Sequence, residues 1–303
     1  MRVLVTGGSG FAGRHLIAHC EAEGDEVVAI SRGSGVDLLD AGATAEAVAG
    51  CAPDVVVHLA AQAHVGRSWE QPRQTLHDNV AMTLNVLEAV RAHAPEAAVV
   101  AAASGEVYGP PPSLPVDETA ALRPQNPYAV SKAAADLLAG FYADAHGVRV
   151  VRARAFNHSG PGQEPIYAIA SFARQIAAGL VAEDDPVLIV TGNPDTRRDY
   201  TDVRDVVRAY RDLALHGVSG EAYNICSGRP ASAGELVQAL GEASGVRVDH
   251  VVDPQLVRAH EVLEVRGSYE KLRAATGWEP LIDLDRTLSD SVAWWQKELR
   301  EHV

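Results

Sequence analysis

The first 23 residues constrain the fold more than any other stretch. Residues 2–6 (RVLVT) form a short apolar run, glycines follow at Gly7, Gly10 and Gly13, and a helical pattern continues from Arg14 to Glu23. A strand, a glycine turn and a helix in this order predict the opening βα unit of a dinucleotide-binding fold. Glycines permit a tight turn and let backbone amides approach a pyrophosphate at the positive end of the helix. The spacing is G-x-x-G-x-x-G rather than the tighter G-x-G-x-x-G, and a plain structural turn is the alternative.

The first half of the chain alternates predicted strands and helices. Strands are predicted at 26–30, 54–59, 97–102 and 148–152, of which 54–59 has the apolar run of a buried parallel strand, and a further strand is expected to end near Asp37. Amphipathic or alanine-rich patterns predict helices at 74–93 and 128–146. Such alternation, with right-handed crossovers, specifies an α/β protein with a Rossmann-type doubly wound parallel sheet.

After Arg154 the pattern changes to a smaller, mixed α/β substrate-binding region. Ser232 and Glu235 have the spacing of a capping box at the start of a helix that ends near Ser244. We expect a dinucleotide-binding domain over residues 1–156, with return segments near 198–226, and a smaller region over 157–303. The other elements predicted in this region are strands at 187–190 and 223–226 and helices at 165–180, 203–215, 268–276 and 284–299.

Composition excludes several classes of protein. Of the 303 residues, 47% are apolar and 22% are charged, as in a globular chain. The net charge of −14 at pH 7 argues against nucleic acid as a partner, because most of the surface would repel phosphates. No apolar run is long enough to span a membrane, and the first residues resemble a strand and a turn rather than a signal peptide. Cys20, Cys51 and Cys226 are widely spaced, so we expect unpaired thiols and a cytoplasmic location.

The strongest indication of chemistry is Tyr128, with Lys132 one helical turn later and Ser104 upstream. Positions i and i+4 share one face of a helix, so the phenol and the ammonium are expected side by side. A nearby cation lowers the pKa of a tyrosine, which is ordinarily about 10, and so helps it to exchange a proton near neutral pH. Ser104 follows a strand, at the edge of the sheet where ligands bind, and can hydrogen-bond the same substrate oxygen. An ordinary Tyr–Lys pair at a helix start is the alternative.

The residues after the second predicted strand bear on the cofactor. An acidic side chain at this position would bind the adenosine ribose of NAD, but the chain has Ser31 and Arg32. An arginine here suits the 2′-phosphate of NADP. We therefore expect NADP(H), with NAD(H) as the alternative if Arg32 is only a solvated surface charge.

Six stretches in the right order resemble the extended short-chain dehydrogenase/reductase superfamily, which comprises nucleotide-sugar epimerases, dehydratases and reductases. They are TGGSGFAG (6–13), HLAAQAHV (58–65), Ser104 with Tyr128-x-x-x-Lys132, Asn157 with the following GPG, RDYTDVRD (198–205) and YNICSG (223–228). The resemblance covers nearly the whole chain. Within the superfamily, RAFNHSGPGQ (154–163), RRDYTDVRDVVRAY (197–210) and YNICSG are most similar to the GDP-6-deoxy-4-keto-D-mannose reductases, with the GDP-mannose 4,6-dehydratases as close relatives.

The resemblance implies a homodimer formed by the helices at 74–93 and 128–146, and a nucleotide-diphosphate sugar in the cleft between the two regions. Arg198 and Arg258 would contact the diphosphate, Asn157 would anchor the substrate loop and Glu261 would approach the nucleotide ribose. The expected substrate-binding residues are His64, Ser104, Glu106, Asn157, Arg198, Arg258 and Glu261. The expected cofactor-binding residues are Gly7, Gly10, Phe11, Gly13, Ser31, Arg32, Asp37, Leu38, Leu59, Ala60, Ala61, Tyr128 and Lys132.

Three chemistries of this superfamily stay open. A reductase needs one hydride at C4 of a 4-keto sugar and one proton from Tyr128, with Lys132 tuning the phenol and Ser104 polarising the carbonyl. A dehydratase also needs a base for the C5 proton and an acid that expels the C6 hydroxyl. Glu106 stands where the family has its base, but Gly105 supplies no acid. We favour NADPH-dependent reduction of GDP-4-keto-6-deoxy-D-mannose to GDP-D-rhamnose, with a 4,6-dehydratase or an epimerase as alternatives.

A catalytically silent nucleotide-binding scaffold is a hypothesis of another class. It predicts a broken Ser–Tyr–Lys set or a blocked glycine loop, and both are intact in the sequence. His58 lies in an apolar strand and is expected to be a core residue, whereas His64 and His158 are candidates for the cleft through their loop positions. No residues have metal-ligand spacing, so we expect no metal.

Overall fold

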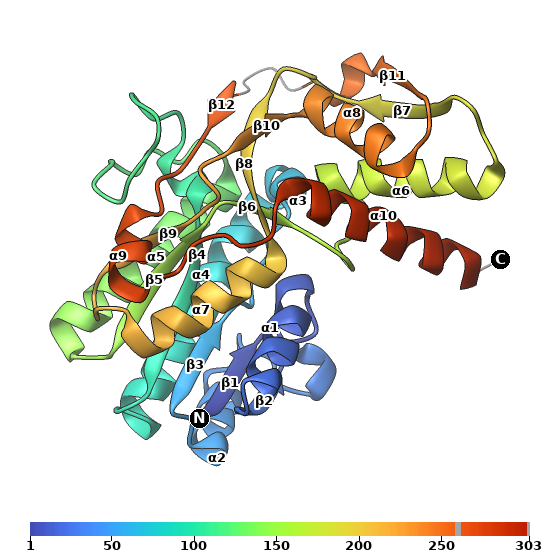
Figure 1. The fold of residues 1–303 in the computed structure, drawn as a ribbon. Helices are drawn as coiled ribbons and strands as arrows, with labels where there is room; N and C mark the ends of the chain where they lie inside the picture. The colour runs from blue at the N-terminus through green and yellow to red at the C-terminus, as the bar shows by residue number, and fades with distance from the viewer. Residues whose placement is uncertain (258–261, 302–303) are drawn as a thin grey trace.

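In the computed structural model, which describes residues 1–257 and 262–301, a six-stranded parallel sheet forms the centre (Figure 1). Every neighbouring pair in this sheet is parallel, which confirms the predicted doubly wound α/β class. In spatial order the strands are β2 (Glu26–Ile30), β1 (Arg2–Thr6), β3 (Val55–His58), β4 (Ala98–Ser104), β5 (Val150–Ala155) and β9 (Ala222–Ile225).

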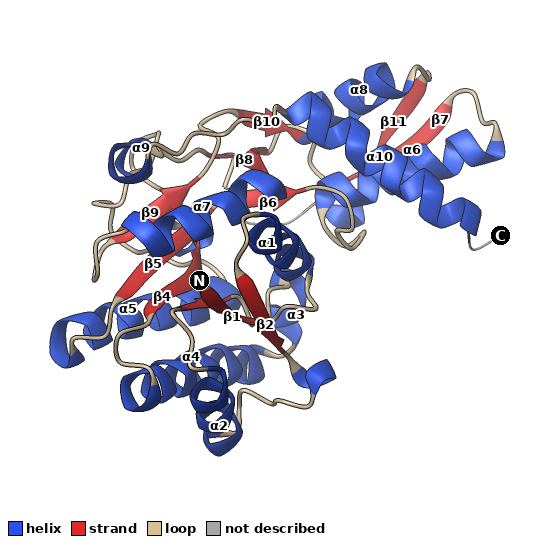
Figure 2. Cartoon of the chain, turned by 60° about the horizontal axis from the view of Figure 1, so that its bottom comes forward, coloured by secondary structure: helices blue, strands red, loops and turns tan. Residues whose placement is uncertain are grey.

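Helices cover both faces of the central sheet (Figure 2). Successive side chains of a strand point to opposite faces, so the apolar strands need a covering layer on each side. Val3 and Val5 of β1 lie in one core, and Leu4 between them lies in the other. The first core includes residues of α1 (Phe11–Ala22), α7 (Val203–His216) and α9 (Glu270–Thr276). The second includes residues of α2 (Ala41–Cys51), α4 (Pro72–His93) and α5 (Pro127–His146).

The strand expected to end near Asp37 is absent, so that prediction was wrong. The chain leaves β2 through a short 3-10 helix, η1 (Arg32–Ser34), and reaches α2 without another strand. Leu38 is buried against α4, and its carbonyl oxygen accepts a hydrogen bond from Asn85 Nδ2 at 2.8 Å. A side-chain amide therefore satisfies a backbone group that a neighbouring strand would otherwise have paired.

The second region is smaller and mixed, as predicted. It contains a β10-β8-β12 sheet with β6 beside β8, and a separate β7-β11 pair. Ser232 and Glu235 form both hydrogen bonds of the predicted capping box, at 3.1 and 2.8 Å. The elements are β6 (Asn157–Ser159), α6 (Ala168–Ala182), β7 (Val187–Thr191), β8 (Arg197–Asp202), β10 (Pro230–Ser232), α8 (Ala233–Ser244), β11 (Val248–Val252), β12 (Glu264–Val265) and α10 (Leu284–Glu301).

Three short helices complete the described chain: α3 (Val65–Glu70), η2 (Gly105–Tyr108) and η3 (Pro254–Leu256). No helix in the described ranges has both the length and the hydropathy that crossing a bilayer requires. Cys20, Cys51 and Cys226 are buried free thiols.

Carboxylates of the RDYTDVRD stretch fasten later segments to β8 and α7. Asp199 is buried and accepts hydrogen bonds from the backbone N–H groups of Ser227, Gly228 and Gly267, at 2.8 to 3.1 Å. Asp205 Oδ2 accepts two more, from the backbone of Leu281 and Ile282. The acidic residues of this stretch thus satisfy buried backbone donors far along the sequence, which explains their places in the motif without assigning them to substrate.

We predict that Asp199→Ala lowers the free energy of unfolding by about 3 kcal/mol, because three backbone donors would lose their acceptor. Urea denaturation checks this, with Asp195→Ala at an exposed position as the control. Equal stability of the two variants would show that water replaces the carboxylate without cost.

Candidate active site

The start of α5 brings candidate catalytic side chains to the carboxyl end of β4. Ser104 is the last residue of β4, and Tyr128 and Lys132 lie one turn apart on α5. Asn126 caps this helix, because its Oδ1 accepts a hydrogen bond from the Ala129 N–H at 2.7 Å. Pro127 at the first helical position adds a preset backbone angle. The local sequence therefore fixes where α5 begins, and with it the positions of Tyr128 and Lys132.

Lys132 is buried, with 6% of its surface exposed, and its Nζ donates a hydrogen bond to the Ala102 carbonyl oxygen at 2.5 Å. Burial lowers the pKa of Lys132 to about 8, since an ammonium in a dry environment is disfavoured, and the charge of Asp136 opposes that change. The side chain carries a positive charge below this pH and is neutral above it. The ammonium is also anchored to β4, one turn of α5 beyond Tyr128.

The pKa of Tyr128 changes in the direction opposite to our prediction. Burial raises the pKa of its phenol, and a hydrogen bond with Ser104 opposes the change, while nearby Glu106 and Tyr167 raise the pKa further. The ammonium of Lys132, which donates to the Ala102 carbonyl oxygen, does not offset this rise. Tyr128 is therefore protonated at neutral pH, which is the form that donates a proton.

Glu106 lies in η2, two residues after Ser104, and is half-buried. Its backbone N–H donates to Ser104 Oγ at 3.2 Å, and its Oε2 accepts a hydrogen bond from Asn126 Nδ2 at 3.1 Å. The preceding Gly105 has no room for a side chain, since an added Cβ would lie 2.9 Å from the Phe156 ring. An acidic group cannot be placed at position 105 without moving that ring.

The glycine turn after β1 has the geometry of an anion cradle. Gly7 has φ +72°, and a Cβ there would lie 2.9 Å from the backbone nitrogen of Ala60. A Cβ on Gly13 would lie 2.3 Å from the Gly7 carbonyl oxygen, so the helix can approach the turn only with glycine. Gly10 caps α1 without a side-chain hydrogen bond, which leaves first-turn amides available to a phosphate. The residues present fit a dinucleotide pyrophosphate.

The segment after β2 places an unengaged arginine beside this turn. Gly7 N–H donates to the Ile30 carbonyl at 3.0 Å, so the ends of β1 and β2 are adjacent. Arg32 is exposed, and within the described residues no ion pair or side-chain hydrogen bond occupies its guanidinium. Ser31 forms a local capping box with Ser34. Asp37 is exposed, and Leu38 is buried beneath it.

Leu59, Ala60 and Ala61 follow β3 and border the glycine turn. Thr6 Oγ1 accepts from the Ala60 N–H at 3.2 Å and is paired at 2.8 Å with His58 Nδ1. His58 is buried, its other ring nitrogen faces Thr83, and burial lowers its pKa to about 3. His58 is therefore a core residue, as predicted.

Sequence reasoning missed a chain of hydrogen bonds that joins the loop after β3 to α5. Asn79 of α4 accepts from the backbone N–H of Gln62 at 2.7 Å and donates to Ser131 Oγ at 2.8 Å. The Ser131 hydroxyl in turn donates to the Tyr128 carbonyl oxygen at 2.7 Å. The contacts of Asn79 join segments distant in sequence.

Tyr167 is a second residue that sequence reasoning missed. It lies at the N-terminus of α6, in the second region, and its ring meets His64 edge to face with centroids 6.1 Å apart. His64 caps α3 by accepting from the Arg67 N–H at 2.9 Å through Nδ1. Tyr167 also raises the pKa of Tyr128, so the two phenols lie near each other although they belong to different regions.

The remaining predicted residues are more scattered. Phe11 of the glycine turn stacks on His158 of β6, with centroids 6.1 Å apart. Asn157 is exposed on the same strand. Arg198 Nη1 donates to the carbonyl oxygens of Arg197 and Val262, at 2.9 and 2.8 Å. Arg258 and Glu261 lie outside the described residues.

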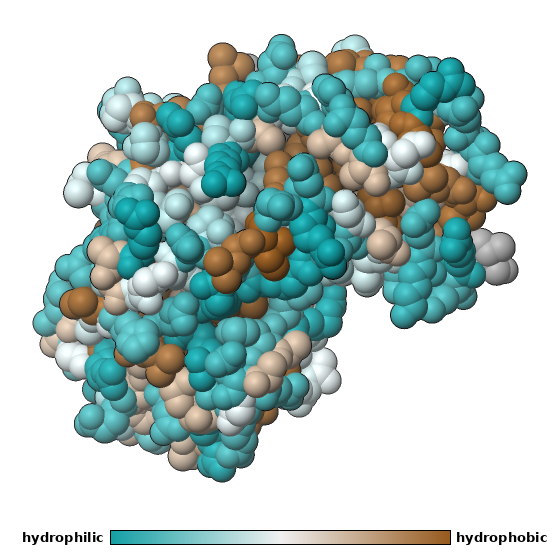
Figure 3. Space-filling model, viewed as in Figure 1, coloured by the Kyte–Doolittle hydropathy of each residue, from teal (hydrophilic) through white to brown (hydrophobic). Residues whose placement is uncertain are grey.

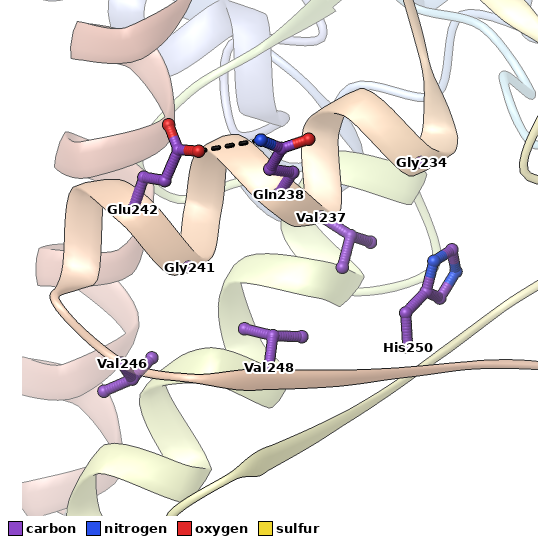
Figure 4. A pocket seen from close by; sticks show the side chains of 8 residues that line it. All are labelled: Gly234, Val237, Gln238, Gly241, Glu242, Val246, Val248 and His250. Atoms are coloured by element: carbon purple, nitrogen blue, oxygen red, sulfur yellow. Dashed lines mark hydrogen bonds between the residues drawn. The ribbon is translucent and has the colours of Figure 1, made fainter.

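A separate hollow lies on the second region, between α8 and β11 (Figure 4). Its floor is apolar, from residues such as Val237 and Val248, and Gln238 pairs with Glu242 along its rim at 2.8 Å. Apolar residues gather on this part of the surface in Figure 3. None of the candidate catalytic residues lines it. In the described chain no three His, Cys, Asp or Glu side chains form a group that could hold a metal ion.

Comparison with known proteins gives a family for this architecture. The model of the NAD dependent epimerase/dehydratase family matches residues 3–226. The chain belongs to this family. GDP-6-deoxy-D-mannose reductase from Pseudomonas aeruginosa is 38% identical over 305 aligned residues, which cover 99% of each chain. UDP-glucose 4-epimerase from Mycolicibacterium smegmatis is 28% identical over 98% of this chain and 99% of its own.

Among solved structures, RMD from Pseudomonas aeruginosa complexed with NADPH superposes with a TM-score of 0.90. It is 37% identical, with 98% of this chain and 99% of that chain covered. The fold of this relative thus matches nearly all of the chain.

Proposed function

We propose that this member of the epimerase/dehydratase family is an NADPH-dependent reductase of a nucleotide-diphosphate 4-keto-6-deoxyhexose, which converts GDP-4-keto-6-deoxy-D-mannose to GDP-D-rhamnose. The observation that carries the proposal is a single protonated donor, Tyr128, beside a position 105 that has no room for an acid. A reduction needs one proton, whereas elimination of water needs an additional acid and base. The 38% identity to a GDP-6-deoxy-D-mannose reductase supports the same choice.

The cofactor would lie on the first region. Gly7, Gly10, Phe11 and Gly13 would hold the pyrophosphate at the N-terminus of α1, and Ser31 and Arg32 would meet the 2′-phosphate. Asp37 and Leu38 would border the adenine, and Leu59, Ala60 and Ala61 would line the side next to the turn. When bound, NADPH supplies the hydride for C4 of the sugar. The relative complexed with NADPH supports this preference, and NAD(H) remains the alternative cofactor.

Tyr128 would donate its proton to the C4 oxygen as the hydride adds. Burial keeps the phenol neutral, so the proton is in place before reaction. Ser104, which hydrogen-bonds Tyr128, would also donate to the carbonyl and hold it in line with the donor. The Lys132 ammonium would add positive charge near the phenolate that forms.

The substrate would lie between the two regions, which we propose to divide at residues 1–156, with return segments near 198–226, and 157–303. His64, Glu106 and Asn157 would contact the sugar. Arg198 would exchange its bonds to backbone carbonyls for the diphosphate. Arg258 and Glu261 are assigned to the diphosphate and the ribose from the sequence motif alone.

The second candidate is a 4,6-dehydratase, because Glu106 is half-buried beside Tyr128 and can serve as a base. The deciding experiment follows NADPH oxidation by purified protein with GDP-4-keto-6-deoxymannose and with its dTDP counterpart. We expect oxidation with the GDP sugar, and a loss of roughly 10²- to 10⁴-fold in Tyr128→Phe with NADPH binding retained. Tyr269→Phe is the matched control. Water loss from GDP-mannose without net NADPH oxidation would establish the dehydratase instead.

We also propose a cytoplasmic homodimer formed through α4 and α5. These helices pack against each other and expose large apolar side chains: Leu76 and Leu84 on α4, and Val130, Leu137 and Phe141 on α5. Leu137 is 60% exposed and Phe141, one helical turn later, is 54% exposed. Large apolar side chains that are exposed together on one helix face are typical of an interaction surface.

A charge on this face is expected to separate the subunits. Phe141→Glu should elute as a monomer in size-exclusion chromatography with light scattering, whereas Leu188→Glu, an exposed apolar residue on β7, should stay dimeric. A wild-type protein that is monomeric at micromolar concentration would refute the interface.

A further inference from the structure

Asn126 makes two contacts that serve different purposes. Its side-chain oxygen caps α5 by accepting from the Ala129 N–H at 2.7 Å, and its side-chain nitrogen donates to Glu106 Oε2 at 3.1 Å. The first contact is needed for the helix start and can be made by several residue types. The second needs a donor, which an amide has in addition to its acceptor. Capping of the helix alone does not account for this second contact.

The second contact holds the carboxylate of Glu106 in place within the candidate active site. Glu106 is held at its backbone by Ser104 Oγ and at its carboxylate by Asn126. Ser104 from β4, Glu106 from η2 and Tyr167 from α6 are near enough to change the pKa of Tyr128. Only one carboxylate oxygen of Glu106 is occupied by a hydrogen bond in the described residues, so Oε1 is available to a ligand.

We propose that Asn126 is a positioning residue for the reaction: it holds Glu106 so that the free carboxylate oxygen accepts a hydrogen bond from a hydroxyl of the sugar. The inference rests on the proposed function for the identity of the ligand. A carboxylate tied by one oxygen presents the other in a fixed direction, which reduces the entropy lost when the sugar binds. Glu106 would then serve substrate binding in a reductase rather than proton abstraction.

The two roles of Asn126 can be separated by substitution. Serine is as good a cap as asparagine but has no amide to reach Glu106, so Asn126→Ser keeps the helix start and removes the second contact. We expect Asn126→Ser to have an unchanged melting temperature and unchanged NADPH binding. Its KM for the keto sugar should rise about tenfold with kcat within about twofold, because binding common to ground and transition states is lost.

A double-mutant cycle with Glu106→Ala shows whether Asn126 acts through Glu106. In the Glu106→Ala background, Asn126→Ser should change KM by less than about twofold, because the group it positions is absent. An equal rise of KM in both backgrounds, or none in either, would overturn the inference. If the wild-type protein oxidises no NADPH with either keto sugar, the proposed function fails on its own.

The contact itself is tested without substrate by the carboxyl-carbon NMR line of Glu106 in ¹³C-labelled protein. The line is assigned by its loss in Glu106→Ala. We expect it to move in Asn126→Ser, since its hydrogen-bond donor is gone. An unmoved line would overturn the inference whatever the substrate is.

Discussion

The attachment of α5 to the carboxyl end of β4 is the interaction on which the active site depends. Lys132 donates to the Ala102 carbonyl of β4, and Ser104, two residues later, hydrogen-bonds Tyr128 of α5. The ammonium is thereby buried and the phenol half-buried, which costs free energy unless their polar atoms find partners. The chain provides those partners from strand ends and helix starts, the parts of an α/β fold that lie nearest to bound ligands.

A buried ion network lies one turn further along α5. Asp136, only 2% exposed, accepts from Arg154 Nε and Nη2 at 3.0 and 2.7 Å and from Arg152 at 3.2 Å. Arg154 also donates to the hydroxyl of Tyr108, the last residue of η2. Removing one member would leave a buried charge unpaired, so the network locks η2, β5 and α5 in one arrangement. That arrangement sets where Glu106 and Tyr128 face each other.

Much of this could be predicted from residues close in sequence. The βα unit with its glycines, the capping box at Ser232 and the core role of His58 depend on local patterns, and the structure agrees with them. Near Asp37, where a strand was expected, the Leu38 carbonyl oxygen is instead paired with a distant amide, that of Asn85. The pKa of Tyr128 was mispredicted because the i,i+4 rule places Lys132 on its face but does not reveal the burial of the phenol, which is the main cause of the raised pKa. Tyr167 comes from another region altogether, and only tertiary structure brings it near.

The pH dependence of turnover tests the central claim, that the buried ammonium of Lys132 supports proton donation by Tyr128. Burial lowers the pKa of Lys132 from 10.5 to about 8, so its charge is present below that pH and lost as the pH rises through it. We predict that kcat/KM for the keto sugar falls with an apparent pKa near 8, and that residual activity of Lys132→Arg lacks this fall, since a guanidinium stays charged. A wild-type profile that is level up to pH 10 would contradict the account.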